Sequence, residues 1–191
     1  MNQMDLLQSY RSRLHHKLIG LMSGTSLDGV DAVLVDIDTD EGGNAVRVTL
    51  KDQVSIAYTP QMKEVVGRLC LPGKADINDV TVAHSGLAYW NAEAVNRLIE
   101  HSNVERTSVD AICMHGQTVW HAPEPQPFPG PEGFLTVTGT LQLGNAQFVA
   151  SLTGLPVISD FRSADMAEGG QGAPLAPYID YLLFHQKGKG V

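Results

Sequence analysis

The residues from Ile19 to Asp31 combine hydroxyls, glycines and carboxylates in a pattern that suits phosphate chemistry. An apolar run, Leu18 to Met22, is interrupted by Ser-Gly-Thr-Ser at 23–26, and a second apolar run begins at Ala32. Two strands joined by a tight Gly-, Ser- and Thr-rich turn form a β-hairpin. The glycine of that turn has no Cβ, so the backbone can approach a ligand closely. A concave set of N–H and hydroxyl donors most often holds an anion such as phosphate.

Two carboxylates, Asp28 and Asp31, follow this turn. They would repel a bare phosphate, so a bridging divalent cation is the natural partner of the pair. Short Gly/Ser motifs also match by chance, and an ordinary hairpin turn with solvated side chains is an equal alternative on these residues alone. The segment is not a Walker loop, because no Gly-Lys-Ser/Thr follows and the next element is a strand rather than a helix.

Polar side chains also follow a short apolar strand predicted at Val109 to Met114. In an open α/β sheet, ligands bind outside the carboxyl ends of the strands, where His115-Gly-Gln-Thr118 would lie. The amide of Gln117 and the groups of His115 and Thr118 donate and accept hydrogen bonds, a mixture that suits sugar hydroxyls. A polar loop that satisfies its own backbone is an equal alternative. His115 ranks lower as a general base, because no carboxylate adjacent in sequence orients it.

A third polar group follows a strand predicted at 156–159 and contains Asp160, Arg162 and Asp165. Arg162 is suited to hold a ligand carboxylate through two hydrogen bonds, and the aspartates are suited to act as base or metal ligand. The alternative is an internal ion pair, Asp160–Arg162 or Arg162–Asp165. Residues 169–172, Gly-Gly-Gln-Gly, form a flexible turn that presents Gln171 close to a ligand.

The elements that would position these groups can be predicted from periodicity. Residues 1–17 form a weakly ordered lead, the hairpin runs to about Asp38, and a third strand covers Val46 to Tyr58 with a break at Lys51-Asp52. Further along, we expect helices at 59–71, 76–101, 146–152 and 174–184, a strand at 135–143 and an unstructured tail at 187–191. An antiparallel meander followed by alternating helices and strands predicts an α/β fold with a mixed sheet.

Five prolines at alternate positions lie between Pro123 and Gly133. Proline removes a backbone donor, so we predict an exposed stiff loop here, without helix or central strand. A proline-rich ligand for a partner domain is the less favoured interpretation.

Composition limits the class of protein. The chain of 191 residues fits one domain, and its formal net charge of −8 without a basic cluster argues against nucleic-acid or anionic-membrane partners. Cys70 and Cys113 are too few for a disulfide framework, and the start resembles no signal peptide. No apolar run approaches the length of a membrane span. We therefore expect a cytoplasmic protein.

The run Gly20 to Asp31 resembles the start of the anhydro-N-acetylmuramic acid kinases, which belong to the superfamily of hexokinase, actin and the sugar kinases. Four later runs are similar to that family in the same order: His115-Gly-Gln-Thr118, Leu141-Gln-Leu-Gly-Asn145, Ser159-Asp-Phe-Arg162 and Gly169-Gly-Gln-Gly-Ala-Pro-Leu175. The wider superfamily carries Asp-x-Gly-Thr in its first hairpin, where this chain has Met22. Our hypothesis is that Asp28 supplies the missing carboxylate and holds the metal.

The resemblance implies a ribonuclease-H-like mixed sheet over residues 18–191, one half of a two-domain actin-like kinase. It implies ATP and Mg²⁺ as cofactors and an amino sugar as substrate. The implied ATP-binding residues are Gly24, Thr25, Ser26, Leu27, Asp28, Gly29, Val30 and Asp31. The implied sugar-binding residues are His115, Gly116, Gln117, Thr118, Arg162, Asp165 and Gln171.

The resemblance also implies a reaction, in which ATP phosphorylates the 6-oxygen of 1,6-anhydro-N-acetylmuramic acid while water opens the anhydro bridge. In that family the catalytic base lies in an Asp-Cys/Thr-Gly-Pro-Gly-Asn motif of the second domain, which residues 1–191 do not contain. We therefore expect the base downstream of residue 191. The alternative is a catalytically inactive homologue that acts as a binding or interaction domain. Apolar surface left bare by a missing second domain would favour aggregation or a homodimer.

Overall fold

The computed structural model describes residue 8, residues 10–173 and residues 176, 179, 181 and 184. Three predicted segments lie partly or wholly outside the described residues. They are the weakly ordered N-terminal segment at 1–17, the helix at 174–184 and the tail at 187–191. The chain divides into two compact units. The first comprises Met1–Gln117 and Leu143–Ser159, and the second comprises Thr118–Gln142 and Asp160–Val191.

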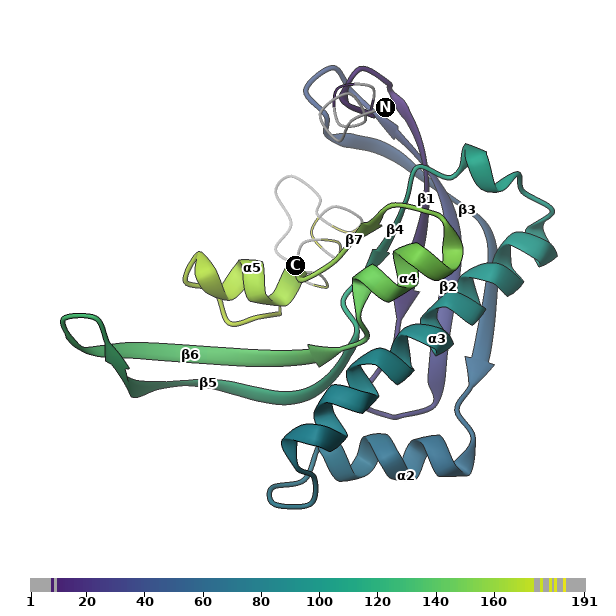
Figure 1. The fold of residues 1–191 in the computed structure, drawn as a ribbon. Helices are drawn as coiled ribbons and strands as arrows, with labels where there is room; N and C mark the ends of the chain where they lie inside the picture. Colours follow the sequence, from purple (N-terminus) through teal and green to yellow (C-terminus); the bar gives the residue numbers. More distant parts are fainter. Residues whose placement is uncertain are drawn as a thin grey trace. The chain divides into compact units, whose positions relative to one another are not determined.

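The first unit is built on a sheet of five strands in the order β3-β2-β1-β4-β7 (Figure 1). β1 (His15–Met22), β2 (Gly29–Thr39) and β3 (Ala45–Ala57) form an antiparallel meander. β4 (Ala111–Met114) lies parallel to β1, and β7 (Val157–Ile158) lies parallel to β4. This mixed sheet confirms the predicted α/β class. The first strand begins at His15, earlier than the Leu18 expected from the apolar run.

A β-bulge interrupts the pairing of β2 with β3. Leu34 pairs with Asp52 and the next residue, Val35, pairs with Leu50, so Lys51 is the extra residue. A bulge bends a strand and increases its local twist. The break predicted at Lys51-Asp52 is therefore confirmed.

The helices of the first unit begin at the capping residues that the sequence indicates. Thr59 Oγ1 accepts from the N–H of Met62 at the start of α2 (Pro60–Leu69). Asp76 and Asp79 form a capping box at the start of α3 (Ile77–Ser102). Further along this unit, the described residues form the 3₁₀ turn η1 (Arg106–Ser108) and the helix α4 (Ala146–Thr153), which ends at Gly154 with a φ of 71°. Capping of this kind satisfies orphan backbone groups at both helix ends.

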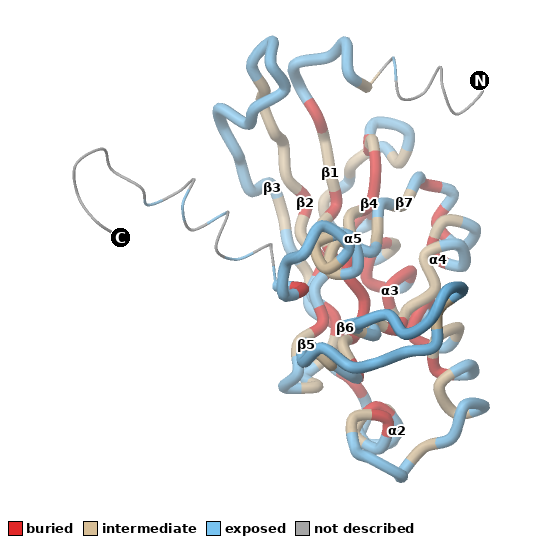
Figure 2. The backbone as a smooth tube through the Cα atoms, turned by 90° about the vertical axis from the view of Figure 1, so that its left-hand side faces the viewer, coloured by how far each residue is buried: buried red, intermediate tan, exposed pale blue. Residues whose placement is uncertain are grey.

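The core of the first unit lies between the sheet and α3, which contacts β2, β3 and α4 (Figure 1). Buried positions gather on the central strands and on the inner side of α3 (Figure 2). The largest fully buried side chains include Ile19, Leu87, Leu98 and Ile112. Trp90 meets the buried Tyr58 edge-on, with ring centroids 5.2 Å apart.

The second unit contains a two-stranded antiparallel ribbon, β5 (Gln117–Gly130) and β6 (Gly133–Leu143). The prediction of an irregular loop from Pro123 was wrong, whereas the strand predicted at 135–143 is confirmed. In a strand, alternate residues direct their backbone N–H to the same edge. The four prolines of β5 occupy alternate positions, so all of them fit the edge that faces away from β6. A ribbon has only edge strands, where proline is tolerated.

A short helix, α5 (Phe161–Ala167), follows Asp160 in the second unit. No capping pattern predicts this helix, because Asp160 has a left-handed backbone (φ 63°) and its side chain makes no capping hydrogen bond. From the sequence, Asp160, Arg162 and Asp165 are expected only as polar groups that follow a strand. Their helical backbone places Arg162 and Asp165 one turn apart, so both side chains can reach the same neighbour.

Candidate functional site

The turn between β1 and β2 is held in a specific, strained shape. The N–H of Leu27 donates to the carbonyl of Gly24 at 3.2 Å, and Leu27 adopts a left-handed backbone with φ 56°. This conformation costs a non-glycine residue about 1–2 kcal/mol, and such strain tends to gather at ligand-binding sites. The backbone of the turn is therefore fixed by the surrounding fold rather than by local preference.

Close approach of β3 explains how that strain is maintained. A Cβ on Gly29 would lie 2.0 Å from the carbonyl oxygen of Ile56, so only glycine fits at this position. One residue earlier, the carbonyl of Asp28 accepts from the N–H of Tyr58 at 2.9 Å. The sheet thus fixes the turn from its β3 side.

A hollow of about 480 Å³ opens at this turn. Five of the predicted phosphate-binding residues meet around it: Gly24, Ser26, Asp28, Gly29 and Asp31. The remaining lining residues are Met22, Ser55, Ile56 and Ala57. Three other predicted residues do not line it, and one of them, Val30, is only 1% exposed and belongs to the core. The structure therefore brings together the glycine, hydroxyl and carboxylate groups of the predicted set.

Ser55 is a member of this hollow that the sequence analysis missed. It lies opposite Asp31 in the β2–β3 register, and its hydroxyl donates to Asp31 Oδ1 at 2.5 Å. Ser55 is one polar residue in an ordinary strand pattern, so nothing local marks it. Only the register, which is itself shifted by the Lys51 bulge, places it beside the turn.

The polar side chains around the hollow present only oxygen atoms, from two aspartates and two serines. Hard divalent cations such as Mg²⁺ prefer oxygen ligands and take few of them from the protein, with water and phosphate supplying the others. The described residues contain no cluster of three or more His, Cys, Asp or Glu side chains that could hold a metal by themselves. Asp28 and Asp31 thus fit a cation that is shared with a phosphate ligand.

The end of β4 supports the same turn from the other side. Gln117 is 1% exposed, and its Nε2 donates to the carbonyl of Gly24 at 3.1 Å. His115 is buried beside it, and Gly116 has φ 75°. The structure therefore gives Gln117 a positioning contact with the turn between β1 and β2. Its predicted contact with sugar stays a prediction.

Two other titratable groups near these elements, Tyr58 and Cys113, are held in their protonated forms. Burial raises the pKa of Tyr58 to about 12, and the neighbouring hydroxyl of Ser23 opposes part of this rise. Burial also raises the pKa of the Cys113 thiol. A thiol with a raised pKa is a poor nucleophile at neutral pH. Neither group is a candidate for the chemistry.

In the second unit, Arg162 and Asp165 hold the same residue, Gly172. Arg162 Nη1 donates to the carbonyl of Gly172 at 2.7 Å, and the N–H of Gly172 donates to Asp165 Oδ2 at 2.8 Å. Among the ion pairs of the described residues, none joins Arg162 to Asp160 or Asp165, so the alternative interpretation is not supported. The two side chains shape the glycine-rich turn that contains Gln171.

Gln171 borders a second cavity, of about 680 Å³, that lies within this unit. The residues around it come from the ribbon and from the end of α5: His121, Pro123, Glu124, Pro125, Thr138, Met166, Gly169, Gly170 and Ala173. Thr118 accepts a hydrogen bond from Gln142 across the ribbon at 3.3 Å. Four of the predicted sugar residues, Thr118, Arg162, Asp165 and Gln171, therefore belong to the second unit.

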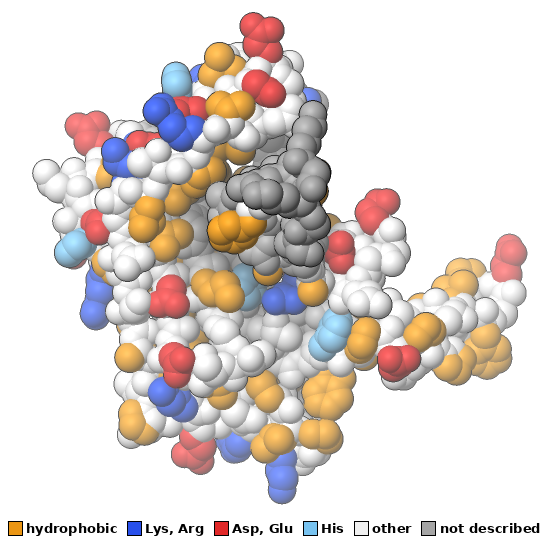
Figure 3. Space-filling view, turned by 180° about the vertical axis from the view of Figure 1, so that it is seen from behind, with side chains coloured by type: hydrophobic (Ala, Val, Ile, Leu, Met, Phe, Trp, Pro, Cys, Tyr) orange, Lys and Arg blue, Asp and Glu red, His pale blue; other side chains and the backbone are white. Residues whose placement is uncertain are grey.

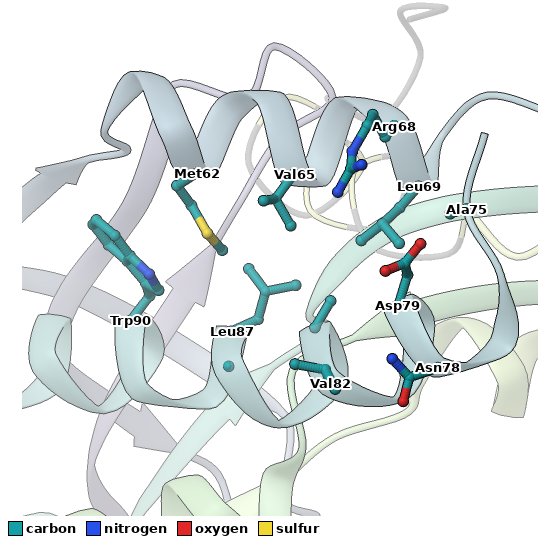
Figure 4. A pocket seen from close by; sticks show the side chains of 12 residues that line it. Met62, Val65, Arg68, Leu69, Ala75, Asn78, Asp79, Val82, Leu87 and Trp90 are labelled. Carbon is teal, nitrogen blue, oxygen red and sulfur yellow. The ribbon is translucent and has the colours of Figure 1, made fainter.

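A third cavity, a groove of about 320 Å³, lies between α2 and α3 (Figure 4). Met62, Val65, Leu87 and Trp90 line it from the two helices, with Arg68 and Asp79 toward one end. None of the predicted site residues borders this groove. Its lining is apolar helix surface, and it shares no chemistry with the hollow at the β1–β2 turn.

Comparison with known proteins identifies the family. The family model described as anhydro-N-acetylmuramic acid kinase matches residues 16–191. The chain belongs to the anhydro-N-acetylmuramic acid kinase family. A relative of that name from Salinibacter ruber is 42% identical over 183 residues, which cover 95% of this chain and 44% of the relative. Another, from Shewanella loihica, is 41% identical over 173 residues, which cover 91% of this chain and 42% of the relative.

The match confirms the resemblance inferred from the five motifs. The chain spans less than half the length of these relatives. The motif-bearing segments therefore correspond to one part of a longer family member. No helix among the described residues combines the length and the apolar character needed to cross a membrane.

Proposed function

We propose that this chain supplies the nucleotide-phosphate site and part of the sugar site of an ATP-dependent amino-sugar kinase. The hollow at the β1–β2 turn carries the proposal, because glycine, hydroxyls and two carboxylates meet there. The names of the relatives support an anhydro-N-acetylmuramic acid as substrate. The reaction we propose is phosphoryl transfer to its 6-oxygen, coupled to opening of the anhydro bridge by water.

At the hollow, the backbone around Gly24 would lie against the phosphates, because this glycine leaves room for a close approach. The oxygens of Asp28 and Asp31 would hold Mg²⁺, with Ser55 fixing the orientation of Asp31. When bound, the ion offsets the charge that develops on the transferred phosphoryl group. Gln117 would keep the carbonyl of Gly24 turned away from the phosphates through its hydrogen bond.

Sugar-binding roles are part of this proposal for two groups of residues, each within its own unit. The first unit contributes His115, Gly116 and Gln117, and the second contributes Thr118, Arg162, Asp165 and Gln171. A muramic acid carries a lactyl carboxylate, which suits a guanidinium such as that of Arg162. We place the base that activates water outside residues 1–191, in line with the motif order of the family.

The test is release of ADP by the protein as its gene encodes it, supplied with ATP, Mg²⁺ and 1,6-anhydro-N-acetylmuramic acid. Asp28→Asn should lower kcat/KM at least tenfold and raise the Mg²⁺ concentration needed for half-maximal rate, because a metal ligand loses its charge. Asp40→Asn is the matched control, since Asp40 bonds Asn44 in the β2–β3 turn and lies outside the hollow.

Unchanged Mg²⁺ dependence in Asp28→Asn would reject the metal assignment. Binding of ATP without any turnover on several amino sugars would reject the kinase and favour the alternative of a binding domain.

A further inference from the structure

The groove between α2 and α3 is a concave site of the first unit whose lining differs from that of the hollow at the β1–β2 turn. Apolar side chains of both helices face each other across it (Figure 4): Met62 and Val65 from α2, and Leu87 and Trp90 from α3. Its volume of about 320 Å³ lies at the lower end of the range for small-molecule sites. Val65 is 38% exposed and Val82, on the opposite wall, is 62% exposed. Water therefore contacts apolar walls that a bound molecule would cover.

A glycine of α3 keeps this groove open. Gly86 lines the groove, and a Cβ built on it would meet no atom within 4 Å. Among residues that continue a helix, glycine is the one that stabilises it least. α3 therefore gives up stability at a position from which a longer side chain would reach into the groove.

The charged groups of the groove lie toward one end, and one of them is available to a ligand. Asp79 belongs to the capping box of α3 and accepts from the N–H of Asp76 at 3.2 Å, so its charge already serves the helix N-terminus. Arg68 is exposed and takes part in none of the ion pairs of the described residues. A guanidinium holds a carboxylate through charge-assisted hydrogen bonds. The groove is thus apolar along its length and favours a negative charge at one end.

The ribbon of the second unit also displays hydrophobic side chains, which gather there in the space-filling view (Figure 3). Phe128 of β5 is 59% exposed and Phe134 of β6 is 80% exposed. Neither residue lines any of the three cavities described above. A small molecule needs a concave site, so the groove suits one and this part of the ribbon does not.

Both helices that form the groove are also in contact with the β1–β2 turn or with the strand end that holds it. On the α2 side, a Cβ on Gly67 would lie 3.8 Å from Leu27 Cδ1, so the side chain of this left-handed residue packs against the helix. On the α3 side, the ring of Trp90 meets Tyr58, whose backbone N–H donates to the carbonyl of Asp28 at 2.9 Å. Two short chains of direct contacts therefore join the groove to the turn.

We propose that the α2–α3 groove binds a small amphipathic carboxylate, with its apolar part between Val65 and Leu87 and its carboxylate at Arg68, and that this binding stabilises the β1–β2 turn. A ligand that contacts both helices opposes their separation, and so restricts opening of the strained backbone at Leu27. Two ligands that restrict the same motion favour each other's binding. The part that concerns ATP rests on the proposed function: the carboxylate should raise ATP affinity, and ATP should raise carboxylate affinity by the same factor.

Binding can be measured with 3-phenylpropanoate, which carries one ring and one carboxylate, on the protein as its gene encodes it. The indole N–H signal of Trp90 in a proton–nitrogen correlation spectrum, assigned with Trp90→Phe, should shift on titration. The neutral 3-phenylpropanamide should bind about fivefold more weakly, because it lacks the charge-assisted bond. Arg68→Gln should remove this difference. Lys63→Gln, which removes a charge of α2 outside the groove, should keep it.

A second variant fills the groove without removing a contact. Gly86→Leu extends a side chain into open space, and it should weaken binding of 3-phenylpropanoate by roughly tenfold or more. Thr81→Leu adds the same side chain to α3 outside the groove, and it should leave binding within about twofold.

The link to the turn has a readout that needs no nucleotide. The N–H of Leu27 donates to the carbonyl of Gly24, so its hydrogen exchange reports opening of the turn. Saturating 3-phenylpropanoate should slow this exchange about fivefold and raise ATP affinity by a similar factor. The Gly86→Leu protein should show neither response.

A Trp90 signal that does not respond to the probe would overturn the proposal and leave the groove to a segment of a partner protein. An amide that binds as tightly as the carboxylate, or binding without slower exchange at Leu27, would overturn it as well. So would an ATP affinity that the probe leaves unchanged. Slower exchange in a protein that does not bind ATP would support the groove site and reject the proposed function instead.

Discussion

The two glycine turns that carry predicted ligand residues are held by opposite means. The turn at Gly24 is fixed by strand register, by the approach of Ile56 to Gly29 and by the buried amide of Gln117. The turn at Gly172 is fixed by two charged side chains, Arg162 and Asp165. The first cannot change shape without disturbing the sheet. The second can exchange its internal partners for a ligand that offers a carboxylate or an N–H donor.

This difference suggests a division of roles. A preformed backbone site suits a phosphate, whose shape is constant and whose binding gains from groups already in place. A turn held by side chains suits the more variable part of a substrate, because Arg162 can release Gly172 when another acceptor arrives. Substitutions should therefore lower global stability at the first turn and alter only local opening at the second.

The largest effect is expected from Gly29→Ala. The new Cβ would overlap the carbonyl of Ile56, a backbone atom that cannot move away cheaply. We expect the free energy of unfolding to fall by about 2–4 kcal/mol, in the range of severe overpacking. Urea denaturation followed by Trp fluorescence measures this change.

Gly86→Ala is the matched control for that experiment, because a Cβ there would meet nothing within 4 Å in the exposed part of α3. It should raise stability by up to about 1 kcal/mol through helix propensity. Equal effects at the two positions would contradict the rigid first turn.

A smaller effect is expected from Gln117→Met, which keeps the volume but removes the bond to Gly24. We expect a loss of about 1 kcal/mol in unfolding free energy, because one net hydrogen bond is removed while the Gly24 carbonyl keeps its bond from the N–H of Leu27. ATP affinity, measured by calorimetry, should fall with it. Gln126→Met at an exposed ribbon position should change neither quantity, and unaltered ATP affinity in Gln117→Met would show that the turn does not need this support.

At the second turn, Asp165→Asn should act locally. The N–H of Gly172 loses a charged acceptor, so its hydrogen exchange should speed up by roughly tenfold, equivalent to about 1.4 kcal/mol of opening free energy. Exchange in the sheet should not change. Asp160→Asn, just before the same helix, is the control. Acceleration that extends into β1 and β2 would show that the two turns are not independent.

The smallest effect concerns a surface ion pair on the sheet. Hydrogen bonds and charge from Lys17, aided by Lys51, lower the pKa of Asp36 from its usual 3.8. Because the pKa of Asp36 is lower in the folded state than the usual 3.8, its ionised carboxylate stabilises the fold at pH values above 3.8. This stabilisation is lost as the pH falls through the lowered pKa. Asp36→Asn should lower the free energy of unfolding by about a few tenths of a kcal/mol at pH 7, since the ion pair with Lys17 is partly exposed. The difference should vanish at a pH low enough to protonate Asp36 in the parent protein. A cost that grows toward acid would contradict the assignment.

Local patterns predicted most of the first unit. The helices expected at 59–71, 76–101 and 146–152 and the first three strands rest on short-range signals, and short-range signals can be interpreted without knowing the fold. Ser55 shows the limit of this approach. Its contact with Asp31 depends on a register that a bulge has shifted by one residue, and no local rule supplies that shift.

The second unit was harder for a physical reason. Proline normally excludes a strand, and the exception at β5 depends on the strand having a free edge, which is a tertiary fact. The buried position of Gln117 is similar. Its amide was expected on a loop surface, but it reaches the carbonyl of Gly24, 93 residues earlier in the chain. In both cases the residue types were informative, and the neighbours that give them meaning were not visible locally.

The alternating prolines of β5 also bear on aggregation. Pro123, Pro125, Pro127 and Pro129 all lack a backbone donor on the same edge of the strand, so an added strand would find no complete ladder there. Growth into a fibril needs an open edge at every step. The prolines therefore protect this edge of the ribbon against the addition of further strands.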